Sequence, residues 1–192
     1  MLYYITSNES KIKNARTHLS IQFEIKELDI QEIQAESLEE IADDKAKKAF
    51  EILKQPLFVN DHAWYIPTLN GFPGPFMHYM NQWLTANDFL NLMLNKEDRS
   101  VILHEVICYI DQQQIKTFIA KYNGTILHTP QGEGRSFDKL ANFTNDGKSM
   151  AQRVFEGKNP LPTAPIWNEF AEWYSEKRVF HDKEGSIYFN EV

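Results

Sequence analysis

Hydroxyl, amide and amino groups cluster where the first strand of this chain is expected to give way to a helix. Residues 2–6 form a short apolar run, and the segment from Thr6 to Lys11, Thr-Ser-Asn-Glu-Ser-Lys, then precedes apolar residues at helical spacing, Ile12, Ala15 and Leu19. Unpaired N–H groups and the helix dipole at such a position favour an anion. The alternative is that Ser7 or Asn8 simply caps the helix while Lys11 is a solvated charge, and spacing alone favours that alternative.

A lysine inside an apolar helix stripe is the second chemical signal. Ser37, with Glu40 three residues later, forms a capping box, and the helix that follows carries an apolar stripe until Pro56 ends it: Leu38, Ile41, Ala42, Ala46, Ala49 and Leu53. Lys45 falls inside this stripe. Its ammonium group must either snorkel outward to water or meet an anion, and both interpretations are open.

Two acidic residues are candidate ligands of a divalent cation. Asp61 follows the apolar run 57–59, which predicts a buried strand with Asn60 and Asp61 at its C-terminal end, where ligands often bind in open α/β sheets. Glu32 lies in the expected loop 29–36. Mg²⁺ typically takes one or two protein carboxylates together with phosphate oxygens and water. In isolation, either acid is more typical of an ordinary surface position.

The histidines and the single cysteine do not indicate a zinc or thiol mechanism. His62, His78 and His104 lack metal-ligand spacing, and Cys108 on an expected central strand is more typical of a core residue than of a nucleophile. One cysteine also excludes an intrachain disulfide framework. A reducing, cytoplasmic location is therefore expected.

The elements that must position these residues are those of an α/β chain with a mixed sheet. Further strands are expected at 23–25, 101–110, 115–120 and 125–127, with a turn at 111–114 and a hairpin signal at Asn123-Gly124. One or two helices are expected between Met80 and Met93, divided near Asn87-Asp88, and a final helix at 166–177. Loops at 70–75 and 132–134 are ordinary turn chemistry on their own.

Length and charge limit the remaining possibilities. The 192 residues form one expected domain, 1–192, with a possible extra C-terminal hairpin or edge strand at 180–192. The net charge of -7 disfavours nucleic acid and anionic membranes as partners, because phosphate-dense surfaces attract basic proteins. Neither a signal peptide nor a transmembrane run is recognisable, so no membrane association is expected.

Taken in order, these motifs resemble the inosine triphosphate pyrophosphatase family, which hydrolyses aberrant purine nucleoside triphosphates to monophosphate and pyrophosphate. The segment 6–11 matches the family's Thr-Gly/Ser-Asn motif with a lysine three residues later. The other matching segments are 29–34 with the metal-binding glutamate, 38–49 with Lys45 at the lysine position, 57–61, and 69–75, which is nearly identical to a family loop. The resemblance covers residues 2 to about 155.

The resemblance implies a fold, a cofactor and a set of roles. The fold is an elongated central mixed β-sheet flanked by helices, with a nucleotide cleft between two lobes, commonly in a homodimer. Glu32 and Asp61 would hold Mg²⁺ against the triphosphate. Lys11 and Lys45 would orient the phosphates, together with Thr6, Ser7 and Asn8. A water molecule, activated by the metal or by Asp61, would then attack the α-phosphorus, so that Asp61, Lys11 and Lys45 are the expected catalytic residues.

The second half of the motif set departs from the family. Phe137 and Asp138 keep the aromatic and aspartate positions of the base loop, while Arg135, Ser136 and Lys139 replace family residues. A family Ser-His-Arg motif is represented by Ala151-Gln152-Arg153. We expect Phe137 to stack on the base and Asp138, Gln152 and Arg153 to complete substrate binding.

Two further departures lie close to the presumed reaction. Asn60 stands where the family has glutamate, and His78, also expected to bind substrate, stands where a lysine is usual. These changes keep two other interpretations open. One is a member of the family with a different nucleotide substrate, and the other is a catalytically weak nucleotide-binding or regulatory protein.

Overall fold

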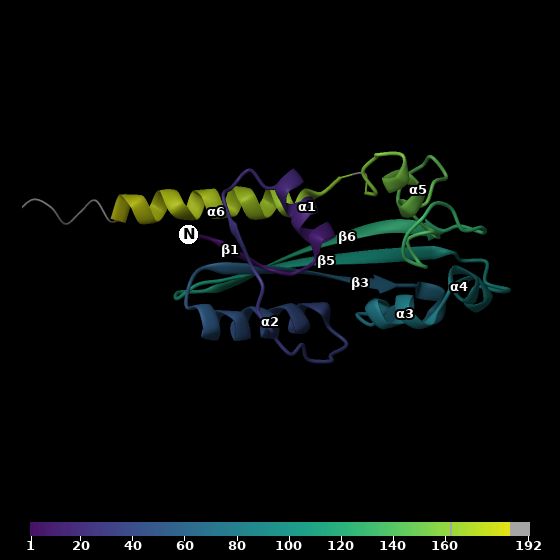
Figure 1. Cartoon of the computed structure of the whole chain (residues 1–192), viewed down its shortest axis with the longest axis horizontal. Helices are drawn as coiled ribbons and strands as arrows, with labels where there is room; N and C mark the ends of the chain where they lie inside the picture. The colour runs from purple at the N-terminus through teal and green to yellow at the C-terminus, as the bar shows by residue number, and fades with distance from the viewer. Residues whose placement is uncertain (162, 185–192) are drawn as a thin grey trace, which may run out of the picture.

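A mixed β-sheet runs through the centre of the computed structural model, which describes residues 1–161 and 163–184 (Figure 1). Its strands within these residues are β1 (Tyr3–Ile5), β2 (Glu24–Lys26), β3 (Leu57–Tyr65), β4 (Pro73–Gly74), β5 (Ser100–Ile110), β6 (Ile115–Ile126) and β7 (Ala141–Asn142). The order is β2-β1-β3-β5-β6-β7, and β4 also pairs with β3. Only β1 pairs in parallel, with β2 and with β3. The expected α/β fold with a mixed sheet is confirmed.

Helices cover both faces of this sheet. They are α1 (Glu9–His18), α2 (Leu38–Leu53), α3 (Met77–Trp83), α4 (Ala86–Leu92), α5 (Met150–Phe155) and α6 (Pro165–Glu184), with a short 3₁₀ turn at Pro67–Leu69. Figure 1 shows α1 and α6 on one face and α2 on the other. The strand order explains this, because β1 lies between β2 and β3, and right-handed crossovers that run in opposite directions place their helices on opposite faces.

The sheet is long, and the helices divide along it. Figure 1 shows α1, α2 and α6 around one half of β5 and β6, and α3, α4 and α5 around the other half. The first half holds one apolar cluster on each face of the sheet: Tyr4, Phe58 and Trp167 belong to the cluster under α1 and α6, and Val59 and Ala63 to the cluster under α2. A third cluster surrounds α3 and α4. Two lobes within one domain remain the prediction that suits this layout.

Strand pairing overrules two local predictions. Asn60 and Asp61 do not end a strand, because β3 continues to Tyr65 in unbroken antiparallel pairing with β5. Asn123 and Gly124 do not form a hairpin turn, because both lie inside β6. A Cβ atom at Gly124 would lie 2.5 Å from the Asn142 carbonyl oxygen on β7, so the glycine permits close strand approach rather than a turn.

Helix ends follow their capping residues. The predicted division at 87–88 is wrong: α3 and α4 separate at Thr85, whose side chain and that of Asp88 form a capping box at the start of α4. Ser37 caps α2 by accepting from the Glu40 amide at 3.2 Å.

The predicted final helix is confirmed by α6, which extends to Glu184, so residues 180–184 are helical and not part of a hairpin. The rest of that predicted hairpin, 185–192, lies outside the described residues. No helix in the described part of the chain is long and apolar enough to cross a membrane.

Candidate active site

The centre of the candidate site is a gap along one edge of β3. β1 pairs with β3 only as far as Phe58, and β4 pairs with it only from Trp64, so residues 59–63 have no strand neighbour on that edge within the described chain. Asp61 lies in the middle of this gap, beside the carboxyl end of β1. The predicted position of Asp61 at the end of its own strand is wrong, because β3 continues to Tyr65, and the strand that ends beside Asp61 is β1.

Two lysines reach Asp61 from opposite faces of the sheet. The Nζ atom of Lys11, on α1, lies 2.8 Å from Asp61 Oδ1 and donates to the Asn60 carbonyl oxygen at 2.7 Å. The Nζ atom of Lys45, on α2, lies 3.6 Å from Asp61 Oδ2. Between 17% and 19% of each of these three side chains is exposed. Lys11 is therefore not a solvated charge, and Lys45 meets an anion rather than snorkelling to water.

Glu32 completes a cluster of four charges. Its carboxylate accepts a hydrogen bond from Lys45 Nζ, while half of its side chain stays exposed. The two carboxylates therefore approach the same ammonium group. We call Lys11, Glu32, Lys45 and Asp61 the Asp61 cluster. It unites α1, the loop before α2, α2 itself and β3.

Electrostatics within the Asp61 cluster favour the charged forms of Asp61 and Lys45. Burial alone would raise the pKa of Asp61, but the charges of Lys11 and Lys45 overcome this effect and hold the pKa well below its ordinary value. Burial alone would lower the pKa of Lys45, but Asp61 and Glu32 raise it. These interactions thus favour the ammonium form of Lys45 and the ionised form of Asp61.

The N-terminal motif supports this site mainly through its fold. Asn8 caps α1, with Oδ1 accepting from the amides of Ser10 at 3.0 Å and Lys11 at 3.2 Å, while Thr6 Oγ1 accepts from the Asn8 amide at 3.1 Å. Ser7 is exposed. The helix-cap interpretation of Asn8 is therefore confirmed. The cap aims the first turn of α1, and with it Lys11, at the gap in β3.

The donor set of the Asp61 cluster fits a divalent cation only in part. No group of three or more histidine, cysteine, aspartate or glutamate side chains able to hold a metal exists among the described side chains, those of residues 1–161 and 163–177. Glu32 and Asp61 offer carboxylates within reach of one cationic group, Lys45. Two carboxylates suit Mg²⁺ where phosphate oxygens and water supply the other ligands. The site therefore fits a cation that arrives with a phosphorylated ligand.

Phe137 does not lie where a base could stack on it. Its side chain is fully buried, with its ring centroid 5.2 Å from that of Trp64 and 4.9 Å from that of Phe89. The stacking prediction is wrong because Phe137 fills the core beneath its loop. Asp138 differs: burial raises the pKa of its carboxyl group, while the nearby charges of Arg135 and His62 act to lower it. The fold therefore brings Asp138 towards β3.

Three other predicted substrate residues form local contacts outside the Asp61 cluster. His78 and Gln82 share a 3.0 Å hydrogen bond on α3. Gln152 donates to Glu156 at 2.9 Å on α5. Arg153 pairs with Asp146 and donates to the Asn159 carbonyl oxygen at 2.8 Å, which ties together the segment around α5. These three residues were assigned to substrate binding from the order of the family motifs, which does not predict their hydrogen-bond partners.

A buried carboxylate that sequence reasoning missed lies on β5. Glu105 is 1% exposed and accepts from Asn60 Nδ2 and Trp167 Nε1, each at 3.1 Å, and from the Tyr122 hydroxyl at 2.9 Å. His62 Nε2 lies 3.3 Å from the same carboxylate. The available signal was a single acid in the apolar run 101–110, since a buried charge requires partners. Cys108 on this strand is buried with its pKa raised by burial, as expected of a core residue.

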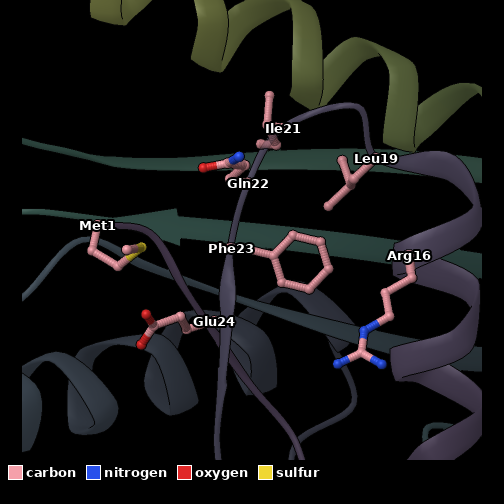
Figure 2. A pocket seen from close by; sticks show the side chains of 7 residues that line it. All are labelled: Met1, Arg16, Leu19, Ile21, Gln22, Phe23 and Glu24. Atoms are coloured by element: carbon pink, nitrogen blue, oxygen red, sulfur yellow. The ribbon is translucent and has the colours of Figure 1, made fainter.

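A separate cavity of about 380 Å³ lies between the end of α1 and β2. Figure 2 shows Arg16, Phe23 and Glu24 among its lining side chains. No residue of the Asp61 cluster lines it. This cavity is therefore not part of the candidate active site.

Fold and site together define an α/β protein with a cationic and acidic cluster suited to phosphate and a divalent cation. Residues 2–162 match the Ham1 family, and the chain belongs to this family. It is 32% identical over 177 residues to the dITP/XTP pyrophosphatase of Methanopyrus kandleri, covering 89% of this chain and 94% of that protein. It is 30% identical over 181 residues to the dITP/XTP pyrophosphatase of Saccharolobus solfataricus, covering 90% and 94%.

Solved structures agree with the fold. The Staphylococcus aureus Ham1 protein superposes with a TM-score of 0.75 at 21% identity, covering 93% of this chain and all of that one. The HAM1 protein from Coxiella burnetii gives 0.74 at 19% identity, covering 92% and 100%. The family resemblance inferred from the motifs is confirmed.

Proposed function

We propose that this chain is a nucleoside-triphosphate pyrophosphatase that converts aberrant purine nucleotides, such as ITP, dITP or XTP, to the monophosphate and pyrophosphate. The observation that carries the proposal is Asp61, held between Lys11 and Lys45 at the edge of β3 with Glu32 beside it. The names of relatives that are 30–32% identical over most of the chain support the same activity.

The two lysines would bind the triphosphate. They enter from α1 and α2 on opposite faces of the sheet, so phosphate oxygens placed at the gap in β3 would meet positive charge from both sides. The N-terminal end of α1 adds its dipole, and the exposed hydroxyl of Ser7 and that of Thr6 lie at the same helix end. Catalysis of phosphoryl transfer depends mainly on such positioning and charge stabilisation.

Glu32 and Asp61 would hold a divalent cation, which we propose to be Mg²⁺. Bound there, the cation would neutralise charge on the triphosphate and on the departing pyrophosphate. Both carboxylates now contact Lys45, so that ammonium group must shift towards phosphate oxygens as the carboxylates take their new partner. The mobile stem of a lysine suits this exchange, because its ammonium group is a point charge on four methylene groups.

The low pKa of Asp61 keeps its carboxylate ionised before a ligand binds, as a metal ligand or a proton acceptor requires. The two lysines that lower this pKa would turn towards phosphate oxygens when a triphosphate is bound. In the proposed reaction a water oxygen forms a bond to the α-phosphorus, the water proton passes to Asp61 or to solvent, and the bond from that phosphorus to the bridging oxygen breaks. Pyrophosphate leaves with the bonding electron pair, and Lys11 and Lys45 stabilise its charge.

The other parts of this proposal rest on the family resemblance. They are a homodimer, a cytoplasmic location, two lobes within one domain, and a nucleotide-binding cleft between those lobes. Light scattering after gel filtration would test the dimer, which predicts twice the mass of the 22.5 kDa chain.

A pyrophosphate-release assay tests the function. The parent protein is incubated with Mg²⁺ and ordinary or deaminated purine and pyrimidine triphosphates, and we expect the fastest release from the deaminated purines. Glu32→Gln should lower release at least about 100-fold, the usual cost of removing one charge-stabilising group. Glu133→Gln is the matched control, because that carboxylate is exposed and lies 3.9 Å from its only ion-pair partner, Lys139, in the described chain.

The same assay separates the alternatives. Release from a different nucleotide would favour a member of the family with altered substrate specificity. Asn60 and Gln152, which depart from the family motifs, are the reason to test this alternative. Thermal stabilisation by nucleotide and Mg²⁺ without any release would favour a nucleotide-binding protein. Absence of release from every nucleotide would refute the enzymatic proposal.

A further inference from the structure

The backbone and the side chain of Asn60 are held by different elements. Its carbonyl oxygen, in the stretch of β3 that has no strand neighbour on one edge within the described chain, accepts from Lys11 Nζ at 2.7 Å. Its side chain donates from Nδ2 to Glu105 Oε1 and to the Val106 carbonyl oxygen on β5, each at 3.1 Å. Asn60 is 2% exposed. It therefore links the ammonium group of Lys11 to a carboxylate on the neighbouring strand.

This link matters because β3 is paired on one edge only at this point. A strand with ladder hydrogen bonds on both edges is held by two neighbours, whereas residues 59–63 pair with β5 alone in the described chain. The two bonds from the Asn60 side chain to β5 add to that pairing. Since the side chain and the carbonyl group are close in the covalent structure, these bonds restrict rotations that would turn the carbonyl oxygen away from Lys11.

Glu105 is fixed in turn by donors from two further elements. The Tyr122 hydroxyl on β6 donates to Oε2 at 2.9 Å, and Trp167 Nε1 on α6 donates to Oε1 at 3.1 Å. Glu105 is 1% exposed, and a buried carboxylate needs such donors to offset the loss of water. The carboxylate therefore reaches Asn60 from a position that β6 and α6 determine.

The departure of Asn60 from the family motif fits this arrangement. The Asn60 amide donates to the carboxylate, whereas a glutamate at position 60 would bring a second negative charge beside Glu105. The acidic group that the motif carries on β3 is thus found in this chain on β5, 3.1 Å from the Asn60 nitrogen. Asn60 and Glu105 therefore form a matched pair of one donor and one acceptor.

We propose that Glu105 is a positioning residue for phosphate binding, because it holds, through the Asn60 side chain, the carbonyl oxygen that places Lys11 beside Asp61. This inference rests on the proposed function, in which Lys11 binds the triphosphate. Lys11 Nζ lies 2.8 Å from Asp61 Oδ1, and the Asn60 carbonyl oxygen is its second acceptor. Glu105 has no hydrogen bond or ion pair with Lys11 or Asp61 in the described chain, and it acts through Asn60.

Binding of inorganic tripolyphosphate without Mg²⁺ tests the inference, because neither a base nor a metal contributes. Its affinity is measured by calorimetry for the parent, Glu105→Gln and Asn60→Ala. Removal of the Glu105 charge by itself would tighten the binding of an anion, whereas loss of a positioned lysine weakens it. We expect both variants to bind about threefold to tenfold more weakly. Thr117→Val is the matched control, because it removes a 2.9 Å side-chain hydrogen bond to Asp43 and should change the affinity less than about twofold.

Exchange of the donor and the acceptor tests whether the pair acts as a unit. Asn60→Asp places two carboxylates together and should weaken tripolyphosphate binding at least about tenfold. Adding Glu105→Gln to this variant restores one donor, one acceptor and the charge of the parent, so most of the lost affinity should return. Unchanged or tighter binding in folded Glu105→Gln and Asn60→Ala would overturn the inference, as would a folded double variant without any recovery.

Turnover separates the positioning of phosphate from recognition of the base. In Glu105→Gln, kcat/KM should fall about tenfold for ITP and for ATP alike. The ratio of kcat/KM for ITP to that for ATP should stay within about twofold of the parent, because both substrates share the triphosphate. A loss confined to one substrate would contradict the inference. If the parent releases no pyrophosphate, the proposed function fails, and the affinity for tripolyphosphate still decides the role of Glu105.

Thermal unfolding decides that role if the parent binds no tripolyphosphate. Lys11→Met should lower Tm less in the Glu105→Gln protein than in the parent, because a lysine that is no longer positioned has less contact to lose. An equal fall in Tm in the two proteins would overturn the inference.

Discussion

Replacing Asp61 by asparagine should lower the stability of the protein and its turnover but strengthen phosphate binding in the absence of metal. The substitution preserves shape but leaves the ammonium groups of Lys11 and Lys45 facing a neutral amide. Removing one partner of a buried ion pair costs about 3–5 kcal/mol, and exposed pairs contribute about 0–1 kcal/mol. With 17–19% of each side chain exposed, these pairs lie between the two limits. We expect a loss of about 2 kcal/mol in the free energy of unfolding.

Thermal unfolding at pH 7 measures this loss as a fall in Tm of about 4–8 °C for a chain of this size. Lys11→Met combined with Asp61→Asn completes a double-mutant cycle, which should give a coupling energy of about 1 kcal/mol or more because the two atoms lie 2.8 Å apart. Glu133→Gln should change Tm by less than about 2 °C, since its carboxylate is exposed.

Ligand binding should move in the opposite direction from turnover. Without Mg²⁺, loss of the Asp61 charge removes repulsion of phosphate and leaves Lys11 without its anionic partner, while Lys45 keeps Glu32, so tripolyphosphate should bind about tenfold more tightly, equivalent to ~1.4 kcal/mol. Pyrophosphate release with Mg²⁺ should fall at least about 100-fold. A misfolded variant would lose both properties. Release within a few-fold of the parent, or weaker metal-free binding in a folded variant, would refute the assignment of Asp61.

Three further predictions concern Phe137, Gly132 and Glu105, which make close contacts with other segments of the chain. Phe137→Ala should lower the free energy of unfolding by about 3–5 kcal/mol in urea titrations, without changing the ITP to ATP ratio, because its ring is core. Gly132→Ala should cost about 1–3 kcal/mol by the same measurement, because φ is +75° and the added Cβ would lie 2.4 Å from the Gln152 amide nitrogen. Burial opposes ionisation of Glu105, but its hydrogen bonds hold the pKa in the folded state below the unfolded value of about 4.3. The ionised carboxylate therefore stabilises the fold above that pH, and this contribution is lost as the pH falls through the folded pKa. Glu105→Gln should therefore show a shallower loss of Tm between pH 6 and pH 3 than the parent, and an equally steep loss would contradict this role.

Local sequence chemistry predicted the parts of the site that depend on nearby residues. The strand, loop and helix around Asn8 follow from apolar spacing and a capping side chain, because both act within one helical turn. Lys45 lies inside the apolar stripe of α2 for the same reason, and that position predicted an unusual environment. Residue type also made Glu32 and Asp61 candidate ligands of a divalent cation, and that role stays a prediction.

Pairing between distant segments determined where strands end, which the spacing of apolar residues does not predict. The β3 strand passes through Asn60 and Asp61 to Tyr65 because β5 pairs along its whole length, although a local pattern ended it earlier. The turn preference of Asn123 and Gly124 yields to the same kind of pairing inside β6. Base-side motifs were misjudged likewise, since burial of Phe137 depends on Trp64 and Phe89, which are remote in the chain.

The sequence by itself determined the family, the α/β class and the charged residues available for chemistry. Only the tertiary structure decided which charges meet. Lys11 and Asp61 are 50 residues apart and touch because β1 stops where β3 continues, and Glu105 collects donors from three elements. Periodicity specifies the face on which a side chain lies, but contact across elements depends on strand order and length, which arise only when the whole sheet assembles.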